Sequence, residues 1–246
     1  MDVLSRRELS RLKRAAHERL LRWRGKLFVH FLHIGKTGGS ALKAALHDHR
    51  VTRRHALFLH GHRFTLRDVP PGEKAFFVLR DPIARFVSGF YSRQRMGRPR
   101  YETPWKTGEA EAFAAFPSAN DLARALDADD PALAAKAKDA MRSIGHLRHP
   151  FLHWFESEAY FLSRREDILL VGFQESLPHD FEHLKRRLGL PAHLALPGDP
   201  VTAHRNPDDI DKRLDDQAVR NLRAWYAADY SFYELCRREG PAINRG

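Results

Sequence analysis

Short apolar runs alternate along the chain with segments whose apolar residues recur every three or four positions. The runs predict buried strands, and the periodic segments predict amphipathic helices. Strands are expected at residues 26–34, 55–60, 74–80 and 166–175. Helices are expected at residues 39–49, 82–95, 177–189 and 215–238, the last as one long helix with an aromatic face. This alternation predicts an α/β fold, with a mostly parallel sheet that carries helices on both faces.

Two segments lie outside this alternation. Ser5 and Glu8 form the S-x-x-E pattern of a capping box, which predicts a basic N-terminal helix within residues 1–25 that ends near Trp23. We expect this helix to pack on the domain, with docking to a membrane or a partner as the alternative. Residues 104–149 are rich in alanine and predict a helical insert or cap. The whole chain, residues 1–246, is expected to form a single domain.

Composition and charge narrow the class of protein. The chain has 246 residues, of which 43% are hydrophobic, and this is enough for one sizeable core. The formal net charge of +11 favours an anionic partner such as a nucleotide, a nucleic acid, an acidic glycan or a membrane surface, with a generically basic surface as the alternative. Cys236 is the single cysteine, which excludes an internal disulfide and a cysteine metal cluster.

The expected location follows from the same features. A single cysteine fits a reducing compartment. No apolar run approaches the roughly 18 residues of a membrane span. The N-terminal segment lacks the apolar core of a secretory signal. These features predict a cytoplasmic protein.

A glycine-rich loop lies between the first predicted strand and the helix after it. The loop consists of Gly35, Lys36, Thr37, Gly38, Gly39 and Ser40. Glycines allow backbone N–H groups to turn toward one point, and the start of the following helix favours an anion there. Lys36 adds a positive charge, and the Thr37 and Ser40 hydroxyls add donors. The loop therefore predicts a phosphate site, with a tight structural turn and a solvated lysine as the alternative.

A second anion motif follows the third predicted strand. Arg80 lies at the carboxyl end of that strand, where open α/β sheets bind ligands. Ser88 comes eight residues later on the next helix, so that both side chains could contact one phosphate. The alternative is that Arg80 pairs with Asp81 and that Ser88 is a small packing residue. Arg85 and Arg93 are expected to be solvated charges on the face of this helix.

Two histidines, His60 and His62, end the second predicted strand. Residues i and i+2 of a strand point to the same side, so both imidazoles could face one crevice. An imidazole with a pKa near neutrality is suited to remove a proton from an alcohol. Two histidines could also begin a metal site, but no third ligand is evident from spacing, and a structural role is a further alternative.

The order of these motifs resembles that of the carbohydrate-type sulfotransferases. The resemblance rests on "HIGKTGGSAL", "HGH", "VLRDPIARFVSGFY" and "VGFQESL", and it covers residues 27–90 strongly and 167–236 loosely. It is closest to the branch that contains heparan sulfate 2-O-sulfotransferases and their bacterial relatives. These enzymes use 3′-phosphoadenosine 5′-phosphosulfate (PAPS) on a P-loop NTPase-like fold related to nucleotide kinases.

The resemblance implies a role for each motif. The loop from Gly35 to Ser40 would hold the 5′-phosphosulfate, with Lys36 as its catalytic cation. Arg80 and Ser88 would hold the 3′-phosphate, His62 would be the general base, and His60 a nearby helper. No metal is implied. Gly35 stands where the family usually has proline, and the chain lacks the membrane anchor and cysteine pairs of the secretory-pathway members. This difference indicates a bacterial, cytoplasmic member.

The implied partner is a hydroxyl-bearing acceptor, such as a saccharide, a glycolipid or a small molecule. Nucleic acid is not implied, peripheral membrane contact is left open, and no oligomeric state is predicted. A nucleotide kinase is the nearest alternative, but it should carry lysine after the glycines and a magnesium carboxylate, for which Asp81 is the candidate. A basic nucleic-acid-binding protein is a further alternative, although no recognised reading motif is present. The polar loop at residues 200–209, with His204 and Arg205, is predicted to be a lid over the cofactor, with a solvated surface loop as the alternative.

Overall fold

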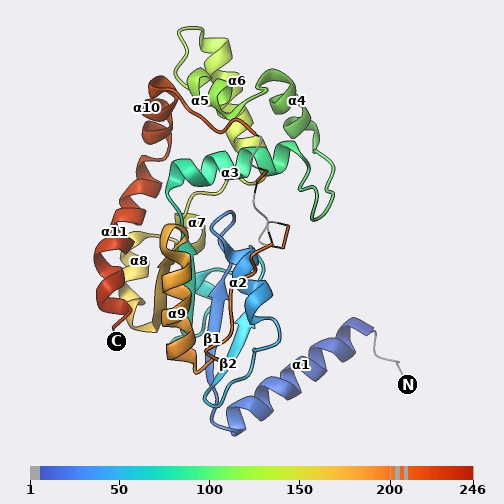
Figure 1. Ribbon diagram of the computed structural model, residues 1–246, viewed down its shortest axis with the longest axis vertical. Coiled ribbons are helices and arrows are strands. Elements are labelled where there is room, and N and C mark those ends of the chain that lie inside the picture. The colour runs from blue at the N-terminus through green and yellow to red at the C-terminus, as the bar shows by residue number, and fades with distance from the viewer. Residues whose placement is uncertain (1–5, 200, 203–205, 208–209, 246) are drawn as a thin grey trace.

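A computed structural model describes residues 6–199, 201–202, 206–207 and 210–245 (Figure 1). Within these residues, four parallel strands form one sheet in the order β2-β1-β3-β4. The strands are β1 (Leu27–Leu32), β2 (His55–Leu59), β3 (Lys74–Leu79) and β4 (Ile168–Phe173). The four predicted strands and their parallel pairing are therefore confirmed.

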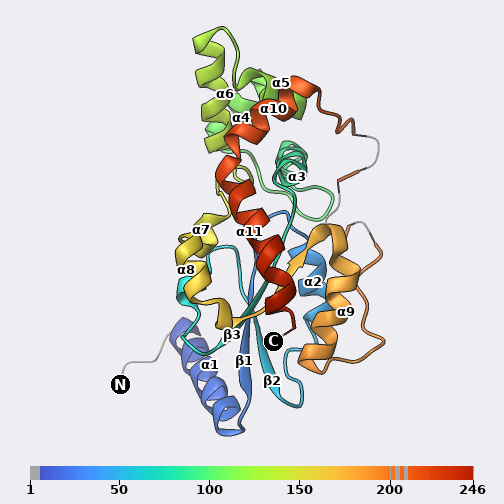
Figure 2. The ribbon, with the colours of Figure 1, turned by 90° about the vertical axis from the view of Figure 1, so that its left-hand side faces the viewer.

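One face of the sheet is covered by α2 (Gly39–Leu46) and α9 (Leu177–Leu188), as Figure 2 shows. These helices bury their apolar sides on alternate residues of the strands. The layer between them and the sheet includes Val29, Phe31, Leu42, Leu57, Phe76, Leu170, Phe181 and Leu184. Helix α9 ends at Gly189, which has a φ of 65° and so supplies the left-handed residue of a common helix terminus.

The opposite face is covered by α7 (Leu152–Phe155), α8 (Glu158–Ser163) and α11 (Ala227–Ile243). Aromatic rings fill this layer. The Phe155 ring centroid lies 4.5 Å from that of Phe77 on β3 and 4.6 Å from that of Phe232 on α11. The prediction of helices on both faces is thus confirmed. Short 3-10 turns join the layers at Leu66–Asp68, Arg165–Asp167 and Gln174–Ser176.

Helix α1 (Arg6–Trp23) lies beside the amino end of β1 (Figure 1). Its Leu21 is buried against Phe28 and Ala56, and the Arg22 guanidinium stands 4.2 Å from the centre of the Phe28 ring. Ser5 of the predicted capping box lies outside the described residues. No helix in the described part of the chain is both long and apolar enough to cross a membrane.

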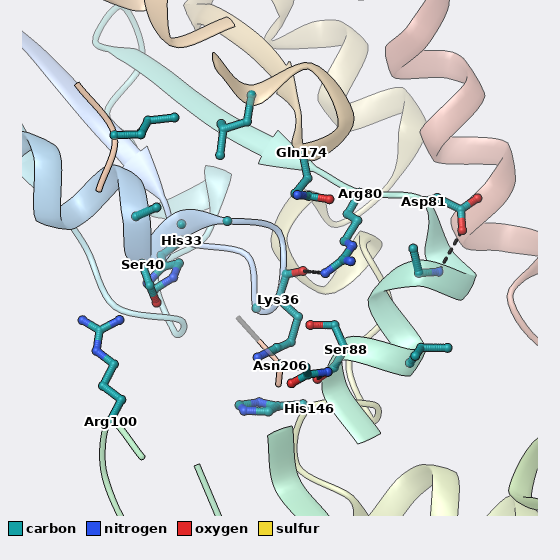
Figure 3. A pocket seen from close by; sticks show the side chains of 18 of the residues that line it. His33, Lys36, Ser40, Arg80, Asp81, Ser88, Arg100, His146, Gln174 and Asn206 are labelled. Atoms are coloured by element: carbon teal, nitrogen blue, oxygen red, sulfur yellow. Dashed lines mark hydrogen bonds between the residues drawn. The ribbon is translucent and has the colours of Figure 1, made fainter. Parts of the chain in front are cut away.

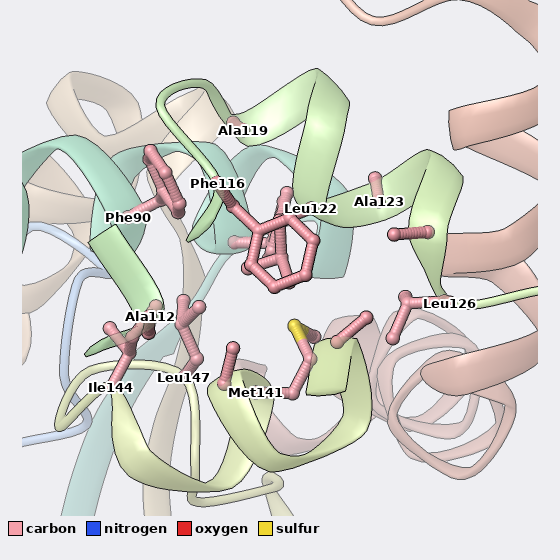
Figure 4. Close-up of a cluster of buried hydrophobic side chains, with 14 of the residues drawn as sticks. Phe90, Ala112, Phe116, Ala119, Leu122, Ala123, Leu126, Met141, Ile144 and Leu147 are labelled. Atoms are coloured by element: carbon pink, nitrogen blue, oxygen red, sulfur yellow. The ribbon is translucent and has the colours of Figure 1, made fainter. Parts of the chain in front are cut away.

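The segment predicted as an insert folds into α4 (Thr107–Ala115), α5 (Ala119–Ala125) and α6 (Pro131–Ser143). These helices share a separate core with α3 (Pro82–Gln94) and α10 (Asp216–Trp225), shown in Figure 4. Small alanines let the helices approach closely around Phe90, Phe116 and Leu122. Helix α3 runs from the end of β3 into this helical layer, so it connects the sheet to the segment.

The prediction of one long C-terminal helix is wrong, because the chain breaks into α10 and α11 at Tyr226. The φ and ψ of Tyr226 are −99° and 23°, and its side chain is buried beside Phe86. Helix α10 packs on α5, where the Asn221 amide donates to the carbonyls of Ala123 and Arg124 at 3.0 Å each. Helix α11 packs on the sheet instead. One straight helix could not follow both surfaces.

Candidate active site

A cavity of about 990 Å³ lies at the carboxyl edge of the sheet, between the strands and α3. Segments after all four strands contribute to it: His33 after β1, His62 after β2, Arg80 after β3 and Gln174 after β4. This edge is where open α/β sheets bind ligands, because the loops there converge. The lining carries the cations Lys36, Arg80, Arg100 and Lys212, with Asp81 as its carboxylate. The cavity is therefore suited to an anion.

The glycine pair shapes the floor of the cavity. Gly38 has a φ of 91°, and a Cβ there would lie 2.9 Å from Leu177 of α9. A Cβ on Gly39 would lie 2.3 Å from the imidazole of His33. Gly38 is also the N-cap of α2, and it offers no side chain to the free N–H groups of the first turn. Gly38 therefore leaves the start of α2 open toward the cavity, and Gly39 leaves room for the His33 ring to pack against the loop.

Lys36, the second residue of this loop, has an uncommon backbone conformation and a lowered side-chain pKa. Its φ of 69° is uncommon for a residue with a side chain, and such strain concentrates at functional sites. Burial, together with the charges of Arg95 and Arg80, lowers the pKa of its ammonium group to about 7. An anion in the cavity would reverse that effect, since it favours the charged form.

The Arg80 guanidinium is hydrogen-bonded only in part by the protein. Within the described residues, its Nε is buried without a hydrogen-bond partner, while Nη1 lies 3.5 Å from the carbonyl of Lys36. The charges of Glu175 and Asp81 favour the protonated form of Arg80 and so oppose the lowering of its pKa by burial. Asp81 nevertheless forms no ion pair with Arg80 among the described residues. It caps α3 by accepting from the N–H of Ala84 at 2.8 Å, and it accepts from the hydroxyl of Tyr230 at 2.9 Å. A buried guanidinium of this kind is suited to a phosphate.

The remaining predicted cofactor residues divide into two groups. Gly35, Lys36, Gly38, Gly39, Ser40, Arg80 and Ser88 line the cavity (Figure 3). Thr37 does not, because its buried hydroxyl donates to the carbonyl of Ile34 at 3.1 Å and so closes the turn. Ser88 comes from α3, and its carbonyl accepts from the Asn206 amide at 3.5 Å. His204 and Arg205 of the predicted lid lie outside the described residues.

His62 lines the cavity, and a hydrogen bond fixes which of its two ring nitrogens carries the proton. Its Nδ1 lies 2.8 Å from the carbonyl of His33, which can only accept, so Nδ1 carries the hydrogen. The neutral ring then keeps a lone pair on Nε2. The surrounding protein lowers the pKa of His62 by desolvation, and the charges of Lys43 and Lys36 lower it further. His62 is therefore a neutral base at pH 7.

His60 has different surroundings from His62, contrary to the expectation that both face one crevice. Its Nε2 lies 2.9 Å from Nδ1 of His30, and its ring stacks on Phe64 at 3.4 Å between centroids. The cavity lining contains His62 and not His60. The reason is local: β2 ends at Leu59, so the alternation of a strand no longer holds beyond that residue.

The expectation that Arg85 and Arg93 are solvated is wrong. Both are buried on the inner side of α3. Arg93 makes two hydrogen bonds of 2.7 Å to the carboxylate of Glu109. Arg85 donates to the carbonyls of Gly35 at 3.0 Å and of His149 at 2.8 Å, and lies 3.5 Å from Asp229. Arg85 is three residues after Pro82 and four before Gly89, both buried, and that helical spacing was the signal of its buried face.

Sequence reasoning also missed other residues around the cavity. His33, Arg100, His146, Gln174 and Asn206 line it, most of them from loops that carry no recognisable motif. Burial, together with the charges of His62, Lys43 and Arg100, lowers the pKa of His33 to about 2, so that His33 stays neutral. No group of three or more His, Cys, Asp or Glu suited to a metal occurs among the residues that the structure describes.

The protein is an α/β protein whose cavity is cationic, lined by glycines and flanked by a neutral histidine, an arrangement suited to bind an anionic ligand and to accept a proton. The model of the Sulfotransferase family matches residues 23–235, so the chain belongs to the sulfotransferase family. Membership implies a transferase that moves a sulfuryl group to a hydroxyl-bearing acceptor. No curated protein and no solved structure gives a significant match to the chain.

Proposed function

We propose that this protein transfers a sulfuryl group from PAPS to a hydroxyl of a saccharide, a glycolipid or a small molecule. One observation carries the proposal: a single cavity combines an arginine whose buried Nε lacks a hydrogen-bond partner among the described residues with a histidine whose free lone pair is fixed by its hydrogen bond. The first suits a phosphate, and the second suits removal of a hydroxyl proton.

The donor would lie across the loop and the start of α3. Residues Gly35 to Ser40 would hold the 5′-phosphosulfate, and Arg80 with Ser88 would hold the 3′-phosphate. The open helix start at Gly38, the lowered pKa of Lys36 and the partnerless Nε of Arg80 support this fit. The cavity volume of about 990 Å³ is at the upper end for ligand sites, which leaves room for an acceptor as well.

Sulfuryl transfer requires a group that accepts the acceptor's proton and a cation that stabilises the leaving phosphate. His62 would accept the acceptor's proton on Nε2 as that oxygen forms its bond to sulfur. Lys36 would stabilise the negative charge that grows on the phosphate oxygen when the bond between that oxygen and sulfur breaks. Bound PAPS supplies the activated sulfuryl group, and in-line placement of donor and acceptor supplies much of the rate. His60 is proposed as a helper that acts from outside the cavity lining.

Finer assignments rest on the sequence resemblance. We propose a P-loop NTPase-like fold in which Lys36 precedes the glycines, a single domain over residues 1–246, and residues 104–149 as a cap. A bacterial origin, a cytoplasmic location and a place near the heparan sulfate 2-O-sulfotransferases are proposed on the same basis. Both oxygens of Asp81, the magnesium candidate of the kinase alternative, already accept hydrogen bonds, so no observation favours that alternative.

The proposal is tested by product formation and by ligand choice. The purified protein is incubated with PAPS and a panel of saccharides, glycolipids and phenols, and sulfated products are sought by mass spectrometry. In parallel, calorimetry compares 3′,5′-adenosine bisphosphate with ATP and magnesium. Tight binding of the bisphosphate and a product heavier than its acceptor by the mass of one SO₃ group would support the proposal. Preference for ATP with magnesium would reject it.

A further inference from the structure

Two turns meet at the amino edge of the sheet, at the opposite end of the strands from the cavity. One turn joins α1 to β1, and the other precedes β2 (Figure 1). The backbone N–H of Leu27 donates to the carbonyl of Arg54 at 2.9 Å. The Lys26 ammonium donates to the carbonyls of Thr52 and Arg53 at 2.7 Å each. The two turns therefore present one continuous surface.

Large apolar side chains are exposed on this surface. Trp23 is 83% exposed, Leu27 51% and Val51 49%. Single exposed apolar residues are ordinary, but these three flank two turns that are hydrogen-bonded to each other at one end of the sheet. An exposed tryptophan is costly to leave in water, and its amphipathic ring is suited to the boundary between water and lipid headgroups.

The same surface is strongly basic. Arg24, Arg53 and Arg54 are exposed, and none of them forms an ion pair within the described residues. The sequence has no acidic residue between positions 19 and 47. The acids that flank this stretch interact with other groups: Asp48 contacts His47, and the charge of Glu18 acts on His30. Glu73 contacts Arg22 and His30. The charge of the arginines is therefore offset by no neighbouring carboxylate.

We propose that this amino-edge patch, formed by Trp23, Leu27, Val51, Arg24, Arg53 and Arg54, docks the protein on an anionic lipid bilayer. The apolar side chains would enter the headgroup boundary, and the arginines would contact lipid phosphates. Leu21 and Arg22 hold α1 to the sheet on its other side, so the patch is presented by a fixed surface. The cavity faces away from this edge, so docking leaves it open to the aqueous phase.

Vesicle sedimentation tests the proposal with the whole chain. We expect binding to vesicles that contain phosphatidylglycerol, weak binding to pure phosphatidylcholine, and loss of binding at high salt. Trp23→Ala should weaken binding, because it removes the most exposed apolar side chain of the patch. Arg53→Gln with Arg54→Gln should weaken binding about 25-fold, since each basic residue near an anionic surface contributes about fivefold. The exposed Leu133→Ala and Lys136→Gln with Lys138→Gln, on α6 at the far end of the molecule, are matched controls that should bind normally.

Each outcome is decisive. Patch variants that melt like the wild type, bind 3′,5′-adenosine bisphosphate normally and lose vesicle binding would support the proposal. Equal losses in the patch and α6 variants would reject it, because binding would then follow total charge. Normal vesicle binding with lost affinity for an RNA oligonucleotide would reject it in favour of a nucleic-acid surface. A self-association that the same variants abolish, without vesicle binding, would reject it in favour of a dimer interface.

Discussion

The Arg85 side chain donates a hydrogen bond of 3.0 Å from Nε to the carbonyl of Gly35, the first residue of the glycine-rich loop. The same guanidinium lies over the Trp154 ring at 5.5 Å, and the indole of Trp154 donates to the carbonyl of His62 at 2.8 Å. Arg85 thus contacts both the glycine-rich loop and Trp154, the residue that holds the backbone of the proposed base His62. The planar guanidinium of Arg85, and not its charge alone, positions the Gly35 carbonyl and the Trp154 ring.

Arg85→Lys should therefore weaken binding of 3′,5′-adenosine bisphosphate about tenfold, or about 1.4 kcal/mol. Lysine keeps the positive charge but cannot reach Gly35 and His149 together. Arg93→Lys is the matched control, since Arg93 is equally buried on α3 but bonds Glu109 instead of the loop. It should lower the melting temperature and leave bisphosphate affinity nearly unchanged. Normal binding by Arg85→Lys in calorimetry would show that the loop does not depend on this bond.

Arg80 should set the preference for a ligand with two phosphates. We expect 3′,5′-adenosine bisphosphate to bind at least ten times more tightly than 5′-AMP, about 1.4 kcal/mol, because the buried Nε of Arg80 lacks a partner until a phosphate arrives. Arg80→Ala should remove most of that preference while 5′-AMP affinity changes little. Arg67→Ala, an exposed arginine paired with Glu156, is the control. Equal affinities of the wild type for the two nucleotides would refute the two-phosphate site.

Lys36 should take up a proton when a phosphate-bearing nucleotide binds. Its pKa is about 7 in the free protein, and a bound phosphate raises it by favouring the charged form. Above pH 7 the free lysine is mostly neutral and the bound one is charged, so binding takes up a proton. Affinity should therefore fall as pH rises from about 7, by about tenfold per pH unit at most.

The measurement is calorimetry at pH 8 in two buffers with different ionisation enthalpies. The phosphates of the ligand are fully ionised there, so they contribute little to the uptake. The wild type should take up nearly one proton, and Lys36→Met should take up none while binding more weakly. Identical enthalpies for the wild type in the two buffers would contradict the assigned pKa shift.

His62 should carry the proton transfer. His62→Ala is expected to lower kcat by about 10²–10⁴-fold, the usual effect of a general base, while bisphosphate affinity stays within a few fold. His60→Ala, two residues away but outside the cavity lining, should lose less. If His60→Ala is inactive while His62→Ala keeps its activity, the general base is His60 and not His62.

The pH profile gives a separate check on His62. Desolvation lowers its pKa, so the neutral base persists below the ordinary imidazole range. The acidic limb of kcat/KM should therefore lie below the unperturbed value of about 6.5. Arg85→Met should move that limb upward, because the Arg85 charge also lowers the pKa of His62. A wild-type limb above 6.5 would show that another group limits the rate.

Turnover should be insensitive to chelation. The charge of a transferring sulfuryl group is smaller than that of a phosphoryl group, and Lys36 can stabilise the leaving phosphate oxygen. Rates with and without EDTA are therefore expected to agree. Activity that disappears with EDTA and returns with a divalent ion would overturn this, and His60 and His62 would then be examined as ligands.

The sequence by itself determined the sheet and the anion motifs. Apolar runs such as residues 74–80 and amphipathic segments such as residues 177–189 depend on local periodicity, which is visible in one dimension. The loop from Gly35 to Ser40 was also identifiable, because glycines, lysine and hydroxyls beside a helix start have a local physical meaning. Family membership agrees with that interpretation.

Tertiary structure decided what each charged or titratable side chain contacts. Arg85 is buried because Gly35, His149 and Asp229 surround it, and these residues are distant in sequence. His60 and His62 separate because β2 ends at Leu59, and the C-terminal helix breaks at Tyr226 because its halves meet different surfaces. A one-dimensional pattern specifies which face of an element is apolar. Partners, proton positions and pKa shifts depend on packing between elements, and only the folded chain brings those together.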